Sequence, residues 1–350
     1  MAAPRLAVVL FNLGGPDRPA AVEPFLFNLF NDPAIIGLPW PLRPLLAKLI
    51  SRRRAPTARI IYEHLGGGSP LLPLTQQQAT ALESRLKGND PGHETRTFIA
   101  MRYWHPMSDQ AAQAVKDFRP DKIVLLPLYP QYSTTTTASS LKEWERAARK
   151  AGLANVPTQA ICCYPTHAAL VRAQATLIAP ALEAARRHGL PRVLFSAHGL
   201  PKKVIARGDP YAWQVERTAG AVADALACPG LDWAVCYQSR VGPLEWIGPS
   251  TESELHRAAA DRVPVVVVPI AFVSEHSETL VELDIEYREL AEKQGIPAYI
   301  RVPALGTAEG FIEALADLVT QACHATALPL ADGGQRLCPA GFACCAMTGH

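Results

Sequence analysis

The sequence has little excess charge of either sign. Its 350 residues include 34 Lys and Arg against 32 Asp and Glu, which leaves a formal net charge of +2. Nucleic-acid-binding domains usually carry a marked basic excess, so this balance argues against a nucleic acid as partner. Hydrophobic residues make up 49% and charged residues 19%. Such a composition supplies a large core and excludes an intrinsically disordered chain.

Long hydrophobic runs and targeting segments are also lacking. No stretch of about 18 or more apolar residues occurs, so the sequence predicts no membrane-spanning helix. The N-terminus MAAPRLAVVLFNLGG begins with a strand-like run and has none of the regions of a signal peptide. We therefore expect a cytoplasmic protein whose eight cysteines remain reduced.

Eight short β-rich runs alternate with longer helix-compatible stretches. Most of the runs are continuously apolar, as in parallel strands that are covered on both faces. They lie at 6–13, 95–103, 122–128 and 158–164 in the first half and at 192–197, 233–237, 263–270 and 298–302 in the second. Stretches such as 74–86, 168–187 and 308–323 are expected to form the crossover helices.

This pattern predicts an α/β protein with two similar Rossmann-like domains, each a doubly wound, four-stranded parallel sheet, facing one another across a cleft. The expected limits are 1–166 for the N-terminal domain, 167–322 for the C-terminal domain and 323–350 for a Cys-rich extension. In such folds ligands bind beyond the carboxyl ends of the strands. Candidate functional residues are therefore sought at the strand exits.

A row of glutamates follows the seventh predicted strand. On an α-helix the five side chains fall within an arc of roughly 80°, and no cation lies in the row; they are Glu275, Glu278, Glu282, Glu286 and Glu289. Unpaired carboxylates in a row are typical of a path or site for a divalent cation. The alternative is an ordinary acidic, solvated helix face.

The motif SAHGLP places His198 at the end of the fifth predicted strand. A histidine at a strand exit is a candidate general base, because its pKa lies near the working pH. Two glycine-rich loops, 14–15 and 66–68, match no nucleotide-binding fingerprint.

The segment 25–54 is rich in apolar residues, is interrupted by prolines and ends in Arg52, Arg53 and Arg54. One interpretation is a core helix and loop. The other is an apolar lip beside a cleft, with a basic patch that rests on anionic lipid and makes the protein peripherally membrane-associated.

Taken together, the motifs resemble those of the ferrochelatase family. FNLGGP, HLGGGSP, MRYWHP, LYPQYS, FSAHGLP, RGDPY, YQSRVGP and PIAFVSEHSETLVELDIEY occur in the family's order over residues 5–322. The resemblance implies two Rossmann-like domains that clamp a porphyrin and an enzyme that inserts Fe(II) into it, the last step of haem synthesis. The PLYPQYS stretch is similar to that of the branch that uses protoporphyrin IX.

The resemblance also implies roles for single residues. It identifies His198 and Glu278 as the active-site pair, at which the iron substrate would also bind. Glu282 and Glu286 would conduct protons or iron, and entry of the metal at His198 and Glu278 is the alternative to proton exit there. The residues expected to bind the porphyrin are Arg102, Tyr103, Tyr132, Trp246 and His276.

Some ferrochelatases hold a [2Fe–2S] cluster with one internal cysteine and three near the C-terminus. The resemblance implies Cys338, Cys344 and Cys345 as the C-terminal ligands, with Cys163 (or Cys162) as the fourth. Adjacent strand residues point to opposite faces, so only one of this pair is expected to serve. The spacing C-x5-C-C differs from that of animal members, so zinc or no metal remains an alternative.

Two other functions compete with iron insertion. One is a chelatase for another divalent metal or tetrapyrrole. The other is a non-catalytic tetrapyrrole-binding protein, in which His198 and the acidic row would have no purpose. The partners expected are protoporphyrin IX and Fe(II), and the sequence leaves a homodimer open.

Overall fold

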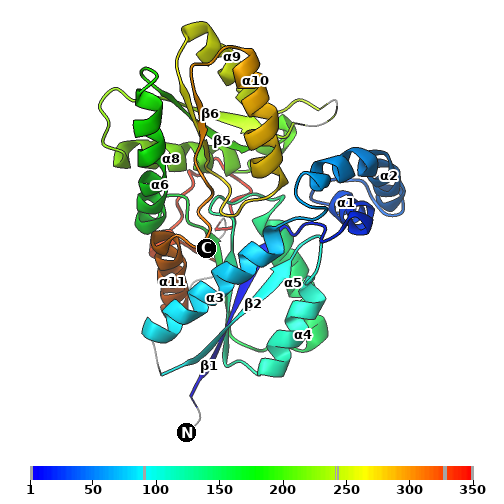
Figure 1. Cartoon of the computed structure of the whole chain (residues 1–350). Coiled ribbons are helices and arrows are strands. Elements are labelled where there is room, and N and C mark those ends of the chain that lie inside the picture. The colour runs from blue at the N-terminus through cyan, green and yellow to red at the C-terminus, as the bar shows by residue number, and fades with distance from the viewer. Residues whose placement is uncertain (1–2, 90–91, 241, 243, 326–328, 348–350) are drawn as a thin grey trace. The chain divides into compact units, whose positions relative to one another are not determined.

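A computed structural model describes the chain except for residues 1–2, 90–91, 241, 243, 326–328 and 348–350 (Figure 1). The chain divides into two compact units. Among the described residues, the first comprises the chain up to Cys163 and Leu315–Arg336, and the second comprises Tyr164–Ala314 and residues 337–347. The chain passes from the first unit to the second after Cys163, close to the predicted limit at 166. The segment Leu315–Arg336 belongs to the first unit again, and the chain then re-enters the second unit at Leu337. The limits 166 and 322 remain predictions for separately folding domains.

The first unit is built on a parallel sheet of five strands in the order β2-β1-β3-β4-β9. The strands are β1 (Arg5–Asn12), β2 (Glu94–Met101), β3 (Lys122–Pro127), β4 (Thr158–Cys163) and β9 (Leu330–Ala331). Four strands were expected. The fifth, β9, was missed because its two residues are too short to show a sequence pattern, and it pairs with Ile161 and Cys163.

The helices of this unit include α1 (Val22–Phe30), α2 (Leu42–Glu63), α3 (Leu71–Asn89), α4 (Ser108–Phe118) and α5 (Thr137–Ala151), with short 3-10 helices at Pro19–Ala21 and Asp332–Gly334. The helices α3, α4 and α5 cover the sheet, whereas α1 and α2 pack against each other. Alternate residues of β1, namely Ala7, Val9 and Phe11, pack with α4 and α5 in one apolar cluster. The helix α3 packs against β2. Burial on both faces explains the continuous apolar runs in the sequence.

The second unit contains a four-stranded parallel sheet in the order β6-β5-β7-β8. Its strands are β5 (Arg192–His198), β6 (Asp232–Gln238), β7 (Val265–Pro269) and β8 (Tyr299–Arg301). Its helices are α6 (Ala168–Arg186), α7 (Lys202–Ala206), α8 (Tyr211–Ala225), α9 (Thr251–Asp261), α10 (Tyr287–Lys293) and the first part of α11 (Glu309–His324). Val193 and Phe195 pack with α6 and α8, whereas Leu194 packs on the opposite face with α9 and α10.

All eight predicted strands are confirmed, with ends within two residues of the expected ones. The segment that carries the glutamates differs from expectation, because Glu278–Glu286 is a π-helix and an α-helix begins only at Tyr287. A π-helix bonds each N–H to the fifth preceding carbonyl and is often found at functional sites. The arc calculated for an α-helix therefore does not apply to these residues.

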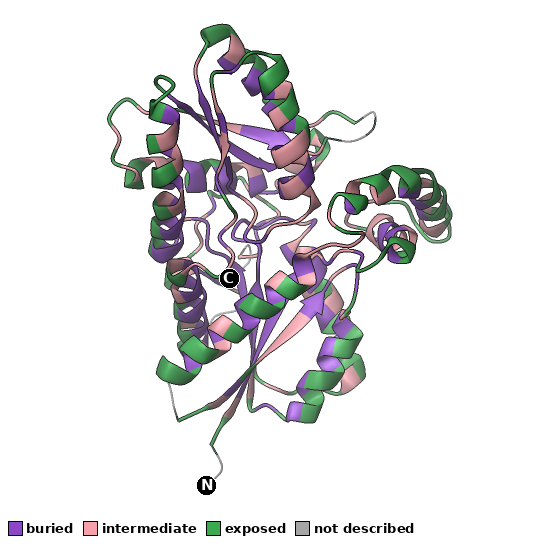
Figure 2. Ribbon diagram, viewed as in Figure 1, coloured by how far each residue is buried: buried purple, intermediate pink, exposed green. Residues whose placement is uncertain are grey.

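The apolar segment 25–54 divides into a buried and an exposed part. Phe25 and Leu26 of α1 lie in an apolar cluster with Tyr103 and Trp104, which agrees with the core interpretation. Farther along, large apolar side chains are exposed, and much of α2 is coloured as exposed in Figure 2; they are Leu38, Trp40, Leu42, Leu45 and Leu49. Among the described residues, no helix has the length and hydropathy needed to span a membrane.

Candidate active site

Two neighbouring strand ends in the second unit bring polar residues together. His198 ends β5 and lies opposite Gln238, which ends β6. At Gly199, the next residue, a Cβ atom would lie 2.9 Å from the Gln238 carbonyl oxygen. Only glycine allows this close approach without displacing the neighbouring backbone. The glycine of the SAHGLP motif is therefore required by the packing between adjacent strands.

His198 is paired with Glu278, the first residue of the π-helix. The His198 Nδ1 atom lies 2.8 Å from Glu278 Oε2. Burial alone would lower the pKa of His198, but the charge and hydrogen bond of Glu278 outweigh it and raise the pKa above its ordinary value. Burial would likewise raise the pKa of Glu278, yet His198 lowers it to about 2. Each partner thus favours the charged form of the other.

Ser239, the residue after β6, joins Glu278 to the next glutamate of the row. Its hydroxyl lies 2.9 Å from Glu278 Oε2 and also forms a short hydrogen bond with Glu282 Oε2. A hydroxyl carries one proton, so it can donate to only one of these carboxylates at a time. The Ser239 N–H and the Tyr287 hydroxyl donate to Glu282 Oε1 at 2.7 and 3.1 Å. Burial and the neighbouring charge of Glu278 raise the pKa of Glu282.

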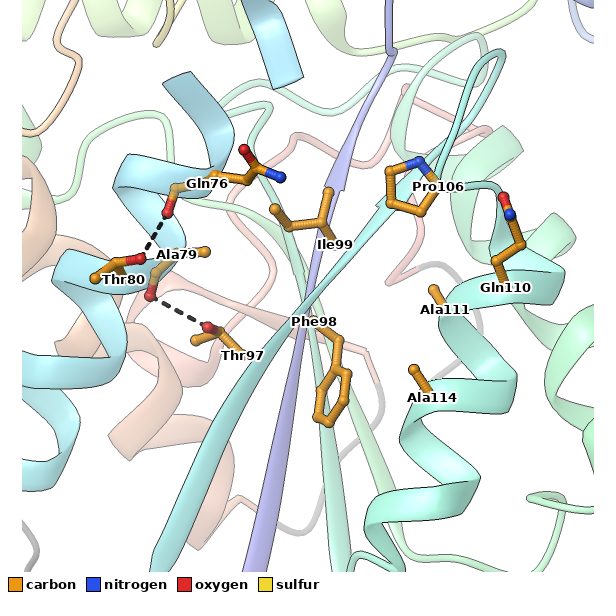
Figure 3. A pocket seen from close by; sticks show the side chains of 10 residues that line it. All are labelled: Gln76, Ala79, Thr80, Thr97, Phe98, Ile99, Pro106, Gln110, Ala111 and Ala114. Atoms are coloured by element: carbon orange, nitrogen blue, oxygen red, sulfur yellow. Dashed lines mark hydrogen bonds between the residues drawn. The ribbon is translucent and has the colours of Figure 1, made fainter. Parts of the chain in front are cut away.

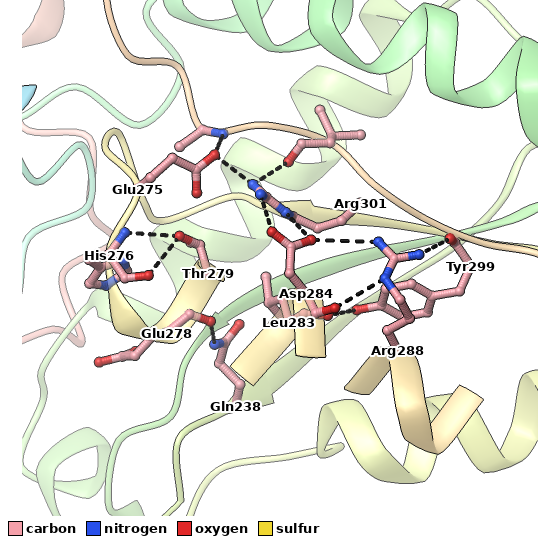
Figure 4. Close-up of polar contacts among 12 residues, drawn as sticks. Gln238, Glu275, His276, Glu278, Thr279, Leu283, Asp284, Arg288, Tyr299 and Arg301 are labelled. Atoms are coloured by element: carbon pink, nitrogen blue, oxygen red, sulfur yellow. Dashed lines mark hydrogen bonds and ion pairs between the residues drawn. The ribbon is translucent and has the colours of Figure 1, made fainter. Parts of the chain in front are cut away.

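Glu275 does not belong to this row, which corrects the expectation that its carboxylate is unpaired. Figure 4 shows it with Arg301 of β8, whose Nη1 lies 2.6 Å from Glu275 Oε1. The same guanidinium binds both carboxylate oxygens of Asp284. The cation that neutralises Glu275 comes from a distant part of the sequence, so no local pattern could reveal it.

Two predicted porphyrin-binding residues lie in this unit with buried polar atoms that no described residue satisfies. These atoms are Nδ1 of His276 and Nε1 of Trp246. Burial lowers the pKa of His276, which keeps its imidazole neutral. Trp246 forms a bridge with Pro201, just after the exit of β5. A buried donor without a partner costs stability, and a ligand that supplies an acceptor would recover it.

The other predicted porphyrin-binding residues lie in the first unit. Tyr103 and Tyr132 are buried, and the Tyr103 hydroxyl donates to Asp32 at 2.9 Å. Arg102 is ion-paired with the same carboxylate at 2.8 Å. Tyr103 therefore contacts Asp32 rather than an open surface. Asp32 was given no role from the sequence, because it lies inside the apolar segment with no motif around it.

The three C-terminal cysteines lie on a segment that packs against the loop carrying the RGDPY motif. The Cys344 N–H donates to the Gly208 carbonyl at 3.1 Å, and the Gln214 side chain donates to the Cys338 sulfur at 3.1 Å. Gly208 has a φ of +95°, and a Cβ atom there would lie 2.8 Å from the Ala343 nitrogen. Among the described residues, no three His, Cys, Asp or Glu side chains converge as metal ligands would.

In the first unit, the sulfur atoms of Cys162 and Cys163 lie 3.3 Å apart. The expectation that the two side chains point to opposite faces is therefore wrong. The register of β4 against β9 shifts between Ile161 and Cys163, which interrupts the alternation at this point.

A hollow in the first unit lies beside β2, between α3 and α4 (Figure 3). Its lining residues are Gln76, Ala79, Thr80, Thr97, Phe98, Ile99, Pro106, Gln110, Ala111 and Ala114. None of these side chains is acidic or basic, so the hollow offers no group for proton transfer or metal binding. His198 at the end of β5 and the glutamates of the π-helix remain the candidate active site.

Comparison with known proteins identifies the family. The family model described as Ferrochelatase matches residues 5–323. The chain belongs to the ferrochelatase family. A ferrochelatase of Caulobacter vibrioides is 58% identical over 315 residues, 90% of this chain and 89% of the relative. The ferrochelatase of Phenylobacterium zucineum is 54% identical over 342 residues, 98% of each chain.

Membership in the ferrochelatase family makes the protein a metal chelatase that inserts iron into protoporphyrin for haem synthesis. This excludes the non-catalytic binding protein as its function. Among solved structures, SirB from Bacillus subtilis with Fe3+ has a TM-score of 0.55 at 13% identity and covers 91% of this chain and 96% of that one. At such low identity the likeness supports the α/β fold alone.

Sequence reasoning missed Ser239 and Gln238 as members of the site, although both lie in the quoted motif YQSRVGP. Their position gave a usable signal. Gln238 ends β6 and Ser239 follows it directly. Because β6 lies next to β5, and the carboxyl ends of adjacent parallel strands lie at the same edge of a sheet, both residues are close to His198.

Proposed function

We propose that His198 and Glu278 are the catalytic pair of iron insertion. The observation that carries this proposal is the 2.8 Å contact between His198 Nδ1 and Glu278 Oε2 at the end of β5. Metalation requires the removal of two pyrrole protons, and a neutral imidazole can accept them one at a time. The carboxylate of Glu278 then stabilises the imidazolium that forms.

Protons leave this pair along the row of glutamates. Ser239 connects Glu278 to Glu282 through its hydroxyl. The lowered pKa of Glu278 means that this carboxylate holds a proton only transiently, and the raised pKa of Glu282 favours the onward step from Glu278 to Glu282. Glu286, at the end of the π-helix, is exposed and delivers the protons to solvent. The same imidazole and carboxylates suit Fe(II), so this route also serves as the alternative path for metal entry.

Two substitutions test the pair. His198→Ala should reduce kcat for Fe(II) insertion about 100-fold or more, because a general base is lost. Glu278→Gln should lose most activity and still bind porphyrin, since it removes a charge and keeps the shape. Near-normal kcat in His198→Ala would refute the assignment.

A separate pair of substitutions tests the order in which the glutamates carry protons. Glu282→Gln should impair insertion less than Glu278→Gln, because Glu282 does not touch His198 and water can replace part of its function. If Glu282→Gln were the more damaging change, the direction of the relay would be wrong.

We also propose that Arg102, Tyr103, Tyr132, Trp246 and His276 bind the porphyrin. Trp246 and His276 offer the buried Nε1 and Nδ1 atoms that lack partners in the described chain. Arg102 offers a guanidinium, which suits the carboxylates of protoporphyrin. Tyr132 contributes an aromatic surface, and Tyr103 acts by holding Asp32.

We further propose a [2Fe–2S] cluster held by Cys338, Cys344, Cys345 and Cys163 (or Cys162). Thiolates are the ligands that such clusters use, and N–H groups directed at the sulfurs are typical of their surroundings. Cys338 and Cys345 are buried, and the Gln214 amide is directed at the Cys338 sulfur. Such a cluster would supply one-electron redox capacity.

We also propose peripheral contact with a membrane through part of the segment 25–54. Trp40, Leu42, Leu45 and Leu49 are exposed, and the last three recur at helical spacing on α2. Exposed Arg52 and Arg53 follow on the same helix. Apolar side chains beside basic ones suit an anionic lipid surface. Under this proposal the protein is cytoplasmic with reversible membrane contact.

A further inference from the structure

The side-chain amide of Gln238 connects the end of β6 to the first turn of the π-helix. Its Nε2 donates to the Glu278 carbonyl oxygen at 2.9 Å, as Figure 4 shows, and to Glu282 Oε2 at 3.0 Å. Gln238 is fully buried and lies opposite His198 in the sheet. One amide therefore contacts the backbone of the residue that pairs with His198 and the carboxylate of the next glutamate.

A second buried side chain sets the orientation of this amide. The Ser196 hydroxyl lies 2.7 Å from Gln238 Oε1. An amide nitrogen only donates and an amide oxygen only accepts. Because the nitrogen faces a carbonyl and a carboxylate, the oxygen faces Ser196, which must donate to it. An amide rotated by half a turn would direct its oxygen at two acceptors, and this contact would be repulsive.

A third side chain completes the hydrogen bonding of Ser196. The Thr251 hydroxyl, at the start of α9, lies 2.9 Å from Ser196 Oγ. Ser196 has a single proton and gives it to Gln238, so Thr251 donates to Ser196. The Cys236 sulfur lies 3.4 Å from the Thr251 oxygen and can donate its thiol proton in turn. Ser196 and Thr251 are fully buried, and hydrogen bonds in such surroundings are stronger than in water.

Gln238 makes these contacts at the point where the π-helix begins. A π-helix is rare and occurs mostly as a short segment, frequently at a functional site. Here the carbonyl of its first residue, Glu278, is tied to β6, the strand that pairs with β5. His198 ends β5, so the two members of the proposed catalytic pair are held by adjacent strands of one sheet. The contact with Gln238 thus fixes the backbone of Glu278 relative to His198.

We propose that Gln238 is a positioning residue for iron insertion: oriented by Ser196 and Thr251, its amide holds the first turn of the π-helix so that the Glu278 carboxylate meets His198. This inference rests on the proposed catalytic pair and goes beyond it, because it assigns the buried side chains that set the geometry of the pair.

Three substitutions remove successive members of this network. Gln238→Met removes the amide and keeps a side chain of similar length. Ser196→Ala removes the donor that orients the amide. Thr251→Val removes a hydroxyl and keeps the shape, whereas Thr251→Ser keeps the hydroxyl. Ser253→Ala is the matched control, because it removes from the same helix a hydroxyl that donates to the Ser250 carbonyl at 2.7 Å.

The first measurement is the kcat of Fe(II) insertion and the KM for protoporphyrin. Gln238→Met should lower kcat about tenfold and change KM less than about twofold, because a catalytic group is misplaced while substrate binding remains. Ser196→Ala should lower kcat by a smaller factor, and Thr251→Val by a smaller one still. Thr251→Ser and Ser253→Ala should behave as the unsubstituted protein does.

The second measurement separates positioning from a general structural role. Gln238→Met and Ser196→Ala are combined with Glu278→Gln, and single turnovers are followed at high enzyme concentration. If Gln238 acts by placing the Glu278 carboxylate, its loss should lower the rate less than about twofold once that carboxylate is absent. A purely structural defect would lower the rate by the same factor in both backgrounds.

Equal factors in the two backgrounds would therefore overturn the proposal. An unchanged kcat in both Gln238→Met and Ser196→Ala, with an impaired Glu278→Gln, would refute the role of Gln238 and leave the catalytic pair standing. Near-normal kcat in Glu278→Gln would refute the pair itself and this inference with it. If Gln238→Met fails to fold, Ser196→Ala decides by the same comparison of backgrounds.

Discussion

Replacing Arg301 by methionine should destabilise the second unit far more than replacing Arg288. Both arginines pair with Asp284, but Arg301 is 10% exposed and also pairs with Glu275, whereas Arg288 is 41% exposed. Arg301→Met leaves Glu275 without its cation and Asp284 with only the more exposed Arg288. Breaking a buried ion pair lowers the free energy of unfolding by about 3–5 kcal/mol. Because Glu275 and Asp284 are partly exposed, the expected loss for Arg301→Met is at the low end, about 3 kcal/mol.

Arg288→Met should lower the free energy of unfolding by less than about 1 kcal/mol, as is usual when an exposed ion pair is lost. The assay is unfolding in guanidinium chloride followed by far-UV circular dichroism. The unfolding midpoints of the two variants are compared with the same slope m, which is the dependence of the free energy of unfolding on denaturant concentration. The Arg301 variant should unfold at the lower denaturant concentration. Raised salt should reduce the difference between the two midpoints only slightly, because buried ion pairs are poorly screened. If Arg288→Met proved as damaging as Arg301→Met, burial would not be what gives the network its strength.

Three further predictions concern the proposed chemistry. Glu278 raises the pKa of His198, so activity should fall on the acid side as His198 becomes protonated. In Glu278→Gln the lowering of the His198 pKa by burial is opposed only by the charge of Glu282, so this limb of the pH–kcat profile should move to lower pH. A move to higher pH would contradict the pairing. Purified protein should be reddish-brown with equal iron and acid-labile sulfide; Cys338→Ser should bleach it and Cys323→Ser should not, whereas a colourless protein with stoichiometric zinc would refute the cluster. Trp40→Ser should weaken sedimentation with anionic liposomes and raise KM for porphyrin more than it lowers kcat; loss of cooperative unfolding would instead indicate a core role.

The strands and the position of His198 in the proposed catalytic pair were predictable for the same reason. Residues such as Val265–Pro269 are buried on both faces, so their apolar runs are visible in the sequence, and His198 follows such a run directly. Motif resemblance then supplied Glu278 as its partner.

The partners of charged residues were not predictable. Arg301 reaches Glu275 across 26 residues of sequence, and Ser139 reaches Asp32 across 107. Neither contact follows a helical or strand period. The π-helix was also missed, because an apolar periodicity near that of an α-helix does not reveal which carbonyl each N–H selects.

The path of the C-terminal tail has a consequence for experiments that shorten the chain. The tail first adds β9 to the edge of the sheet at β4 and only then reaches the segment that carries the three cysteines. A truncation before β9 would leave the backbone groups of Ile161 and Cys163 unpaired at a sheet edge, which invites aggregation. It would remove the cysteines in the same step. Single cysteine substitutions are therefore the variants that isolate the function of the thiols from the protection of the sheet edge.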